Sequence, residues 1–293
     1  MVRSVFIGPY GVRAGWRFLA YVALLVGLVV AIEFLLLPRV LAALHDNETG
    51  LTATSLIYEE IAEGLCVFIA TGVLALCERR RIDAYGLPAR LAFGRLFWEG
   101  AAIGVIAASG VALAMIAAGG MVVHGLALHG GVLLITALLW LIGMVLVGVN
   151  EEYMFRGYPL QALSRGMGFW PAAIVLSLLF GAAHLTKPGE NAVDITNIIL
   201  LGTLLCLSLQ RTGSLWLAVG FHFSFDFMQF FVIGTRNGGA EPAGHLLDVA
   251  FPGPAWVNGG ALGTEASYFM LPTIALFLLY LLLRYPRTQT LQT

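Results

Sequence analysis

Eight long runs of apolar residues, separated by short polar segments, dominate the chain. A helix needs about 20 apolar residues to cross the hydrocarbon core of a bilayer. The pattern therefore predicts an all-α, polytopic membrane helix bundle with about eight transmembrane helices, of which the fifth and sixth are short. The predicted spans are Trp16–Leu44, Leu56–Leu76, Phe97–Ala118, Leu126–Val149, Phe169–Leu185, Ile195–Leu209, Leu215–Ile233 and Ser267–Leu283.

The basic residues are distributed unequally between the two sides that these spans define. If both termini are cytoplasmic, three of the 16 Lys and Arg residues, namely Arg39, Lys187 and Arg236, lie outside and the other 13 lie inside. Cytoplasmic loops of membrane proteins carry an excess of Lys and Arg. The distribution therefore predicts eight spans with cytoplasmic N and C termini.

The composition supports a membrane protein and argues against several other classes. The chain is 59% hydrophobic and only 11% charged, whereas a soluble domain has about 25% charged residues. A net charge of −1 gives no electrostatic reason to expect a nucleic acid partner. Cys66, Cys77 and Cys206 lie within or at the end of apolar runs, which predicts small core residues. No repeat or linker divides residues 1–293, so we predict a single transmembrane domain, with an irregular outer loop or lid at Thr235–Ala266.

Ionisable residues within spans are costly, by about 2.5–3.5 kcal/mol each on insertion scales, and usually face a cavity or each other. Glu151, Glu152 and Arg156 follow the fourth span. On a helix, Glu152 and Arg156 are four residues apart and can pair, whereas Glu151 is rotated by about 100°. Glu151 would then be free to act as a general base. The alternative is a surface ion pair at a cytoplasmic helix end.

Histidines occur in two further apolar segments. His184 ends the fifth span, where a lone histidine is usually an interfacial residue. His222 and Asp226 are four residues apart inside the seventh span. The Asp226 carboxylate could fix the imidazole tautomer and leave the other nitrogen free for a water, an oxyanion or a metal, or the two residues could simply bridge helices.

Taken together, these residues could hold a water between a carboxylate and two imidazoles, or form a Glu/His/His zinc site from Glu151, His184 and His222. Both arrangements indicate hydrolysis. Glu59, Glu60 and Glu63 are weaker candidates that could lie at the interface or line a polar cavity. Asp194 is a plausible N-cap of the sixth span.

Three ordered motifs resemble those of the CPBP family, the CAAX-protease and bacteriocin-processing (Abi) group of intramembrane proteases. They are Glu151-Glu152-x-x-x-Arg156, Phe180-x-x-x-His184 and His222-x-x-x-Asp226. The resemblance implies a catalytic core at about residues 145–234 and a water-filled cavity open to the cytoplasmic side. Asp226 stands where many members have Asn, which makes a direct oxyanion role less suitable for it and an orienting role toward His222 more suitable.

The resemblance also implies roles for the motif residues. Glu151 would activate the water, His184 and His222 would bind it or stabilise the oxyanion, and Glu152 and Arg156 would support them. The favoured mechanism needs no cofactor, and a divalent metal such as zinc at Glu151, His184 and His222 is the alternative.

The predicted function is an intramembrane endopeptidase that uses a glutamate-activated water. Its expected partners are membrane lipid and a membrane-associated peptide or protein substrate, with or without a lipid anchor, and no nucleic acid. The expected location is a prokaryotic plasma membrane. Two other functions stay open: a non-catalytic membrane immunity or scaffold protein, and a proton-coupled transporter, for which the chain lacks inverted repeats.

Overall fold

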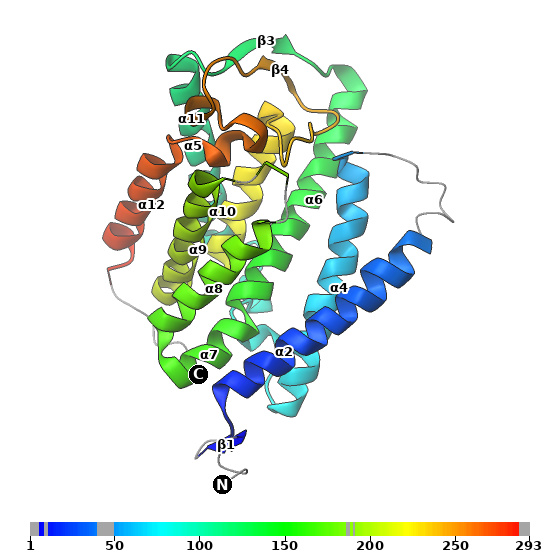
Figure 1. Cartoon of the computed structure of the whole chain (residues 1–293), viewed down its shortest axis with the longest axis vertical. Helices are drawn as coiled ribbons and strands as arrows, with labels where there is room; N and C mark the ends of the chain where they lie inside the picture. The colour runs from blue at the N-terminus through cyan, green and yellow to red at the C-terminus, as the bar shows by residue number, and fades with distance from the viewer. Residues whose placement is uncertain (1–5, 9–10, 40–49, 186–187, 190, 287–293) are drawn as a thin grey trace.

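The structure is a computed structural model that describes residues 6–8, 11–39, 50–185, 188–189 and 191–286 and forms a bundle of helices (Figure 1). A short hairpin of β1 (Ile7–Gly8) and β2 (Gly11–Val12) precedes the bundle. The helices are α2 (Ala14–Val29) with its π-helical continuation η1 (Val30–Leu36), α4 (Ala53–Cys77), α5 (Arg95–Ala117), α6 (Gly130–Arg156), α7 (Tyr158–Met167), α8 (Phe169–His184), α9 (Ala192–Thr212), α10 (Trp216–Asp226) with its π-helical continuation η4 (Phe227–Ile233), and α12 (Met270–Arg284).

The helix lengths confirm the predicted polytopic bundle. Within the described residues, seven helical stretches are long and apolar enough to cross a membrane, and α8, with 16 residues, is a shorter apolar helix. The eight stretches correspond to the eight predicted spans. The predicted end of the first span, Leu44, lies outside the described residues, as does Lys187.

One end of the bundle carries most of the arginines, and we call it the arginine-rich end. Here α2 begins, α4 ends, α6 ends and α12 ends (Figure 1). Glu78, directly after α4, joins α4 to α2 and α7. Arg17 Nη1 of α2 and Arg165 Nη1 of α7 lie 3.2 and 3.1 Å from its carboxylate, and Tyr158 of α7 donates to it. Burial, with the nearby Glu78 carboxylate, raises the pKa of Tyr85 to about 12, so this phenol stays protonated and donates to Glu78 as well.

The fourth helix extends further than its apolar run predicts. It begins at Gly130, four residues after the predicted start at Leu126, and continues to Arg156, so that Glu151 and Glu152 lie inside the helix. Because the last two turns of the helix contain polar residues, a hydropathy pattern does not show that the helix continues through them. At Gly157 the chain turns into α7. This turn requires glycine, because a Cβ there would lie 2.3 Å from the carbonyl oxygen of Tyr153.

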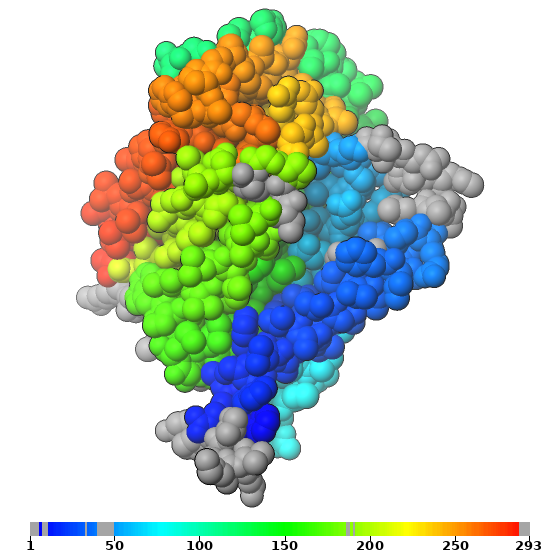
Figure 2. All heavy atoms as spheres, viewed as in Figure 1, coloured from blue at the N-terminus to red at the C-terminus, as the bar shows by residue number. Residues whose placement is uncertain are grey.

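The opposite end of the bundle is covered by short elements, and all of them except β3 lie in the predicted irregular outer loop or lid, Thr235–Ala266. Strand β3 (Val122–Leu126) pairs antiparallel with β4 (Leu247–Ala250), and α11 (Ala255–Asn258) and the 3₁₀ segment η5 (Gly260–Ala266) follow. In the space-filling view these segments cover the top of the molecule (Figure 2). Asn258 supports the turn between β4 and α11 by donating to the carbonyls of Phe251 and Pro252 at 2.9 Å.

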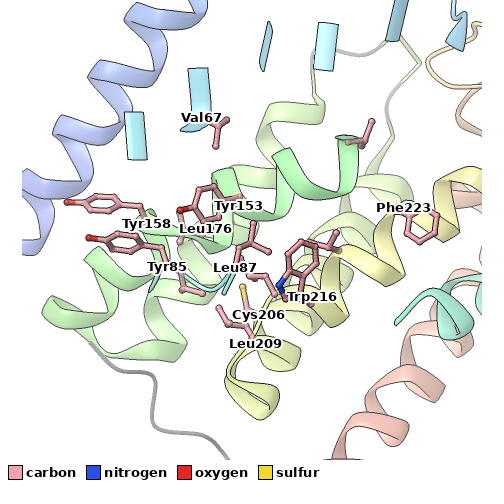
Figure 3. Packing of buried hydrophobic residues seen from close by; sticks show 14 of the residues in the cluster. Val67, Tyr85, Leu87, Tyr153, Tyr158, Leu176, Cys206, Leu209, Trp216 and Phe223 are labelled. Atoms are coloured by element: carbon pink, nitrogen blue, oxygen red, sulfur yellow. The ribbon is translucent and has the colours of Figure 1, made fainter. Parts of the chain in front are cut away.

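Buried apolar side chains form a layer inside the bundle (Figure 3). Its members come from α4, α6, α7, α8, α9, α10 and the segment that joins α4 to α5, and all are buried. Two of the three cysteines, Cys66 and Cys206, are buried as predicted, whereas Cys77 is exposed. The labelled members of the layer are Val67, Tyr85, Leu87, Tyr153, Tyr158, Leu176, Cys206, Leu209, Trp216 and Phe223.

Helix α10 lies directly against α5 through glycines. A Cβ at Gly220 would lie 2.0 Å from the carbonyl oxygen of Phe97, and a Cβ at Gly100 would lie 2.1 Å from that of Leu217. These distances are far below van der Waals contact with a backbone that cannot move alone. The glycines therefore fix the position of α10 and of the histidine it carries.

We expect Gly220→Ala to destabilise the protein by about 1–3 kcal/mol, because the added methyl group forces α5 and α10 apart. The measurement is the thermal unfolding midpoint of the purified protein in detergent. Gly110→Ala on α5 is the matched control, since nothing lies within 4 Å of a Cβ there. Equal midpoints for the two variants would contradict this account of the packing.

Candidate active site

The last two turns of α6 carry a buried ion pair. Arg156 Nη1 lies 3.1 Å from Glu152 Oε1, as the i,i+4 spacing predicted, and both side chains are almost completely inaccessible to solvent. The guanidinium also stacks over the ring of Phe180, 4.4 Å from its centroid. Gly202 on α9 makes room for it, because a Cβ there would lie 2.8 Å from Arg156 Nη2. This is therefore an internal pair held from three helices, and the surface ion pair considered as an alternative is wrong.

The imidazole of His222 bridges α10 and α6. Its Nδ1–H donates to Glu152 Oε1 at 2.9 Å. On the other side of the ring, Nε2 lies 3.6 Å from Glu151 Oε2 and 3.4 Å from Asp226 Oδ2. Glu152 therefore fixes the tautomer, and the prediction that Asp226 does so is wrong. Asp226 instead lies beside Nε2, on the same side of the ring as Glu151.

Asp226 is the last residue of α10, and the chain then continues as the π-helix η4. A π-helical turn changes the direction of the side chains that follow, and such turns occur frequently at functional sites. Here the turn brings Gln229 next to the aspartate, with Gln229 Nε2 3.5 Å from Asp226 Oδ1 and 3.1 Å from Glu265 Oε1.

His184 ends α8 and faces the same space. Its Nδ1 lies 2.9 Å from the carbonyl oxygen of Phe180 in its own helix, so Nδ1–H donates to that oxygen and Nε2 is the nitrogen left for other contacts. The ring also packs edge-on against Phe180, with 4.8 Å between the centroids. These contacts orient the imidazole although it is half-exposed.

A cavity of about 260 Å³ joins these residues. Glu151, His184, His222 and Asp226 all line it, as the sequence analysis expected for a site assembled from three spans. Its polar lining is mainly acidic. The other polar residues of the lining are Glu59, Glu60, Asn237 and Glu265, and apolar residues of α6, α8, α9 and α10 form most of the rest.

One segment of the chain matches a known protein family. Residues 133–228 match the family model described as type II CAAX prenyl endopeptidase, Rce1-like. This segment is a CAAX-protease family domain. It contains all three motifs on which the CPBP resemblance was based and all six residues discussed as candidates. No curated protein and no solved structure matches the chain.

The CAAX-protease segment overlaps the predicted catalytic core of about residues 145–234, but it begins earlier, at residue 133 in α6, and ends at residue 228. The cavity, however, also uses residues outside that segment. Glu59 and Glu60 come from α4, and Glu265 comes from η5. The complete cavity of this CAAX-protease domain is therefore formed with the helices and loops that flank it.

Sequence reasoning ranked Glu60 low and did not single out Asn150 or Glu265. Asn150 Nδ2 donates to the backbone carbonyl of Glu60 at 2.7 Å and to Glu60 Oε2 at 2.9 Å, which fixes α4 against α6 beside Glu151. A buried Asn directly before the paired glutamates was the available signal for this contact. Glu265 lies in a loop segment, and no local pattern marks it.

The start of the sixth span differs from the prediction in one detail. The N-cap is Asn191, whose side chain accepts from the backbone N–H groups of Val193 and Asp194. The assignment of Asp194 as the cap is therefore wrong. An Asn in extended backbone directly before the helix provides the same side-chain acceptor three residues earlier.

The residues proposed as zinc ligands do not form a ready metal site in this arrangement. Among the described residues, no group of three His, Cys, Asp or Glu side chains is placed to hold a metal ion. His222 uses Nδ1 for Glu152, and Nε2 faces two carboxylates.

Proposed function

We propose that this protein is an intramembrane endopeptidase that hydrolyses a peptide bond of a membrane-associated substrate with a water activated by Glu151. The observation that carries the proposal is the approach of Glu151 Oε2 to His222 Nε2, at 3.6 Å, inside a cavity that His184 also lines. Two atoms at this separation can both contact one water at ordinary hydrogen-bond distances. The family match supports the class of reaction.

In the proposed reaction, Glu151 removes a proton from the water while the water oxygen attacks the carbonyl carbon of the substrate. The carbonyl oxygen becomes an oxyanion, to which His184 or His222 donates from Nε2 when that nitrogen carries a proton. The C–N bond then breaks, and the proton held by Glu151 passes to the leaving nitrogen. The products are a new carboxyl group and a new amine.

The other residues support this chemistry indirectly. Glu152 keeps the Nδ1 proton on His222 and so determines that Nε2 faces the cavity. Arg156 balances the charge of Glu152, which is completely buried. Asp226 lies beside Nε2, with 3.4 Å between Nε2 and Oδ2, and can orient the side of the ring that faces the cavity.

The experiment is a cleavage assay with the purified full-length protein in liposomes that contain single-span peptides with varied flanking sequences. We expect fragments that take up one heavy oxygen atom in the new carboxyl group when the water is enriched in that isotope. A protein that binds such peptides without cutting any of them would instead support the immunity or scaffold function.

Removal of metal ions tests the choice between the two mechanisms. We expect dialysis against EDTA, followed by assay in chelator-treated buffer, to leave cleavage within about twofold of the untreated rate, because Glu151 supplies the base without a metal. Metal analysis of the same sample is the control for complete removal. Loss of cleavage that returns on addition of zinc would establish the metal-dependent alternative at Glu151, His184 and His222.

A further inference from the structure

A second cavity, of about 380 Å³, lies at the arginine-rich end of the bundle, where α2 packs against α4 and α7. We call it the α2–α4–α7 cavity. Helix α2 lies on the outside of the bundle here (Figures 1 and 2). The cavity shares no lining residue with the candidate active site. Its volume is within the range of about 300–1,000 Å³ that is usual for ligand sites.

The turn after α4 places Arg80 in the lining of this cavity. The N–H groups of Arg79 and Arg80 bond back to carbonyls of the last turn of α4, in the pattern of a Schellman motif. Arg79 adopts the left-handed conformation that this motif needs, with φ 55°. The chain therefore reverses, so that Arg79 and Arg81 are exposed, whereas Arg80 is partly buried and its guanidinium lies 5.5 Å from the centroid of the Tyr85 ring.

Two further arginines of the lining are held by one carboxylate. Arg17 Nη1 and Arg165 Nη1 lie 3.2 and 3.1 Å from the carboxylate of Glu78. The hydroxyls of Tyr85 and Tyr158 donate to the same carboxylate at 3.3 and 2.8 Å. The side chains of Arg17 and Arg165 are only 19% and 26% exposed. Both guanidiniums are therefore fixed in position before any ligand arrives.

The lining carries more positive than negative charge. Arg17, Arg80 and Arg165 face the single carboxylate of Glu78, which leaves a surplus of two positive charges, because a guanidinium stays protonated. Each guanidinium has five N–H donors. Within the described part of the chain, Arg165 gives one to Glu78, and Arg17 gives one to Glu78 and one to the carbonyl of Val12. The remaining donors suit an anion with several acceptor oxygens, and phosphate is the anion that arginine binds most readily in this way.

The apolar part of the cavity joins this charge to the lipid-facing surface. Trp16 and Leu74 line the cavity together with the arginines. Only Tyr21 is buried among the side chains of α2, all of which the structure describes, and Leu19 on α2 and Leu76 on α4 are 52% and 78% exposed. Trp is enriched at the membrane surface, and basic pockets between transmembrane helices bind the head groups of anionic lipids. The expected ligand is therefore an amphiphile and not a free ion.

We propose that the α2–α4–α7 cavity binds the phosphate group of an anionic phospholipid, whose acyl chains continue along the exposed apolar surface of α2 and α4. Arg17, Arg80 and Arg165 bind the phosphate, and because they belong to three separate elements the bound head group holds α2 against the rest of the bundle. This inference does not depend on the endopeptidase function, since no residue of this cavity takes part in the proposed reaction.

Cys77 is a native probe of the cavity. It is exposed and lines the cavity, whereas Cys66 and Cys206, the other two cysteines of the chain, are buried. The measurement is the rate at which a maleimide labels the full-length protein in nanodiscs of phosphatidylcholine, with or without phosphatidylglycerol. We expect phosphatidylglycerol to slow the labelling about fivefold, as for a site that the lipid occupies about four-fifths of the time.

Arg80→Gln tests the charge of the site. We expect the loss of one arginine to weaken lipid binding about fivefold, which reduces the slowing of Cys77 labelling to about twofold. Arg81→Gln is the matched control, because Arg81 is the next residue and pairs with Asp83 outside the cavity. Arg165→Gln tests the same charge from α7 and replaces Arg80→Gln if that variant does not fold.

Two further arms separate the site from other effects of charged lipid. In Cys77→Ser/Ala89→Cys, the exposed thiol lies at the same end but outside the cavity, and phosphatidylglycerol should leave its labelling nearly unchanged. Millimolar inorganic phosphate, added to nanodiscs of phosphatidylcholine alone, should leave the labelling of Cys77 unchanged. Equal slowing at the two thiols, or equal protection in Arg80→Gln and Arg81→Gln, would overturn the proposal. Protection by inorganic phosphate as strong as that by phosphatidylglycerol would overturn the lipid as the ligand.

Discussion

Replacement of Glu151 by Gln should reduce the cleavage rate by roughly 10²–10⁴-fold, the contribution typical of a general base. Gln has nearly the same shape as Glu but cannot accept a proton from water at neutral pH. Glu151 is partly exposed, and the neighbouring Glu152, not Glu151, accepts the short 2.9 Å hydrogen bond from His222. The change should therefore remove activity while leaving the fold and the position of His222 intact.

The measurement is kcat for a fragment-yielding peptide in liposomes, together with the thermal unfolding midpoint of the same preparation. Glu241→Gln removes an equal charge outside the cavity and should retain wild-type kcat. Wild-type kcat in Glu151→Gln would exclude Glu151 as the base and would leave the non-catalytic function as the better account.

The sequence predicts the position of a helix well where that position depends only on the length of an apolar run. The spans of α4 and α5 were placed to within a few residues because lipid-facing helices need long apolar runs. Helix α7 was missed because it is short and amphipathic, and its start depends on the close approach of Gly157 to Tyr153. The β3–β4 pair joins segments more than a hundred residues apart, which no local pattern reveals.

The candidate site likewise has a part that local sequence spacing predicts and a part that depends on helix packing. The pair Glu152–Arg156 was predictable because helical spacing alone brings the two side chains together. The hydrogen bond from His222 to Glu152 spans 70 residues of sequence and depends on how α10 crosses α6. Local spacing therefore suggested Asp226 as the carboxylate that fixes the tautomer of His222, and only the packing of α10 against α6 shows that Glu152 has this role.

The acidic lining was the least predictable part of the site. Glu60 and Glu265 lie on elements that precede and follow the family segment, and they reach the cavity only because α4 and η5 enclose it. Because these flanking residues lie outside the segment that matches the family, the charge of the cavity is a property of this chain and has to be tested on it.

Arg156→Met should destabilise the protein by about 3–5 kcal/mol, the cost typical of leaving one member of a buried ion pair without its partner. Met fills a similar volume and can still pack against Phe180, so the loss would report the stranded Glu152 carboxylate and not an empty space. The measurement is equilibrium unfolding in mixed micelles, or the thermal midpoint where unfolding is irreversible.

The double variant Glu152→Gln/Arg156→Met distinguishes charge from packing. A neutral amide in place of the Glu152 carboxylate leaves no unpaired charge behind, and its carbonyl oxygen can still accept the Nδ1–H of His222. We therefore expect the double variant to recover most of the stability that Arg156→Met alone loses.

If the double variant is as unstable as Arg156→Met, or less stable, the role of Arg156 is packing against Phe180 and Gly202, and the electrostatic explanation of the pair is wrong. Recovered stability with little activity would show that the charge of Glu152 acts on His222 beyond fixing its tautomer, because the proton on Nδ1 would still be held in place.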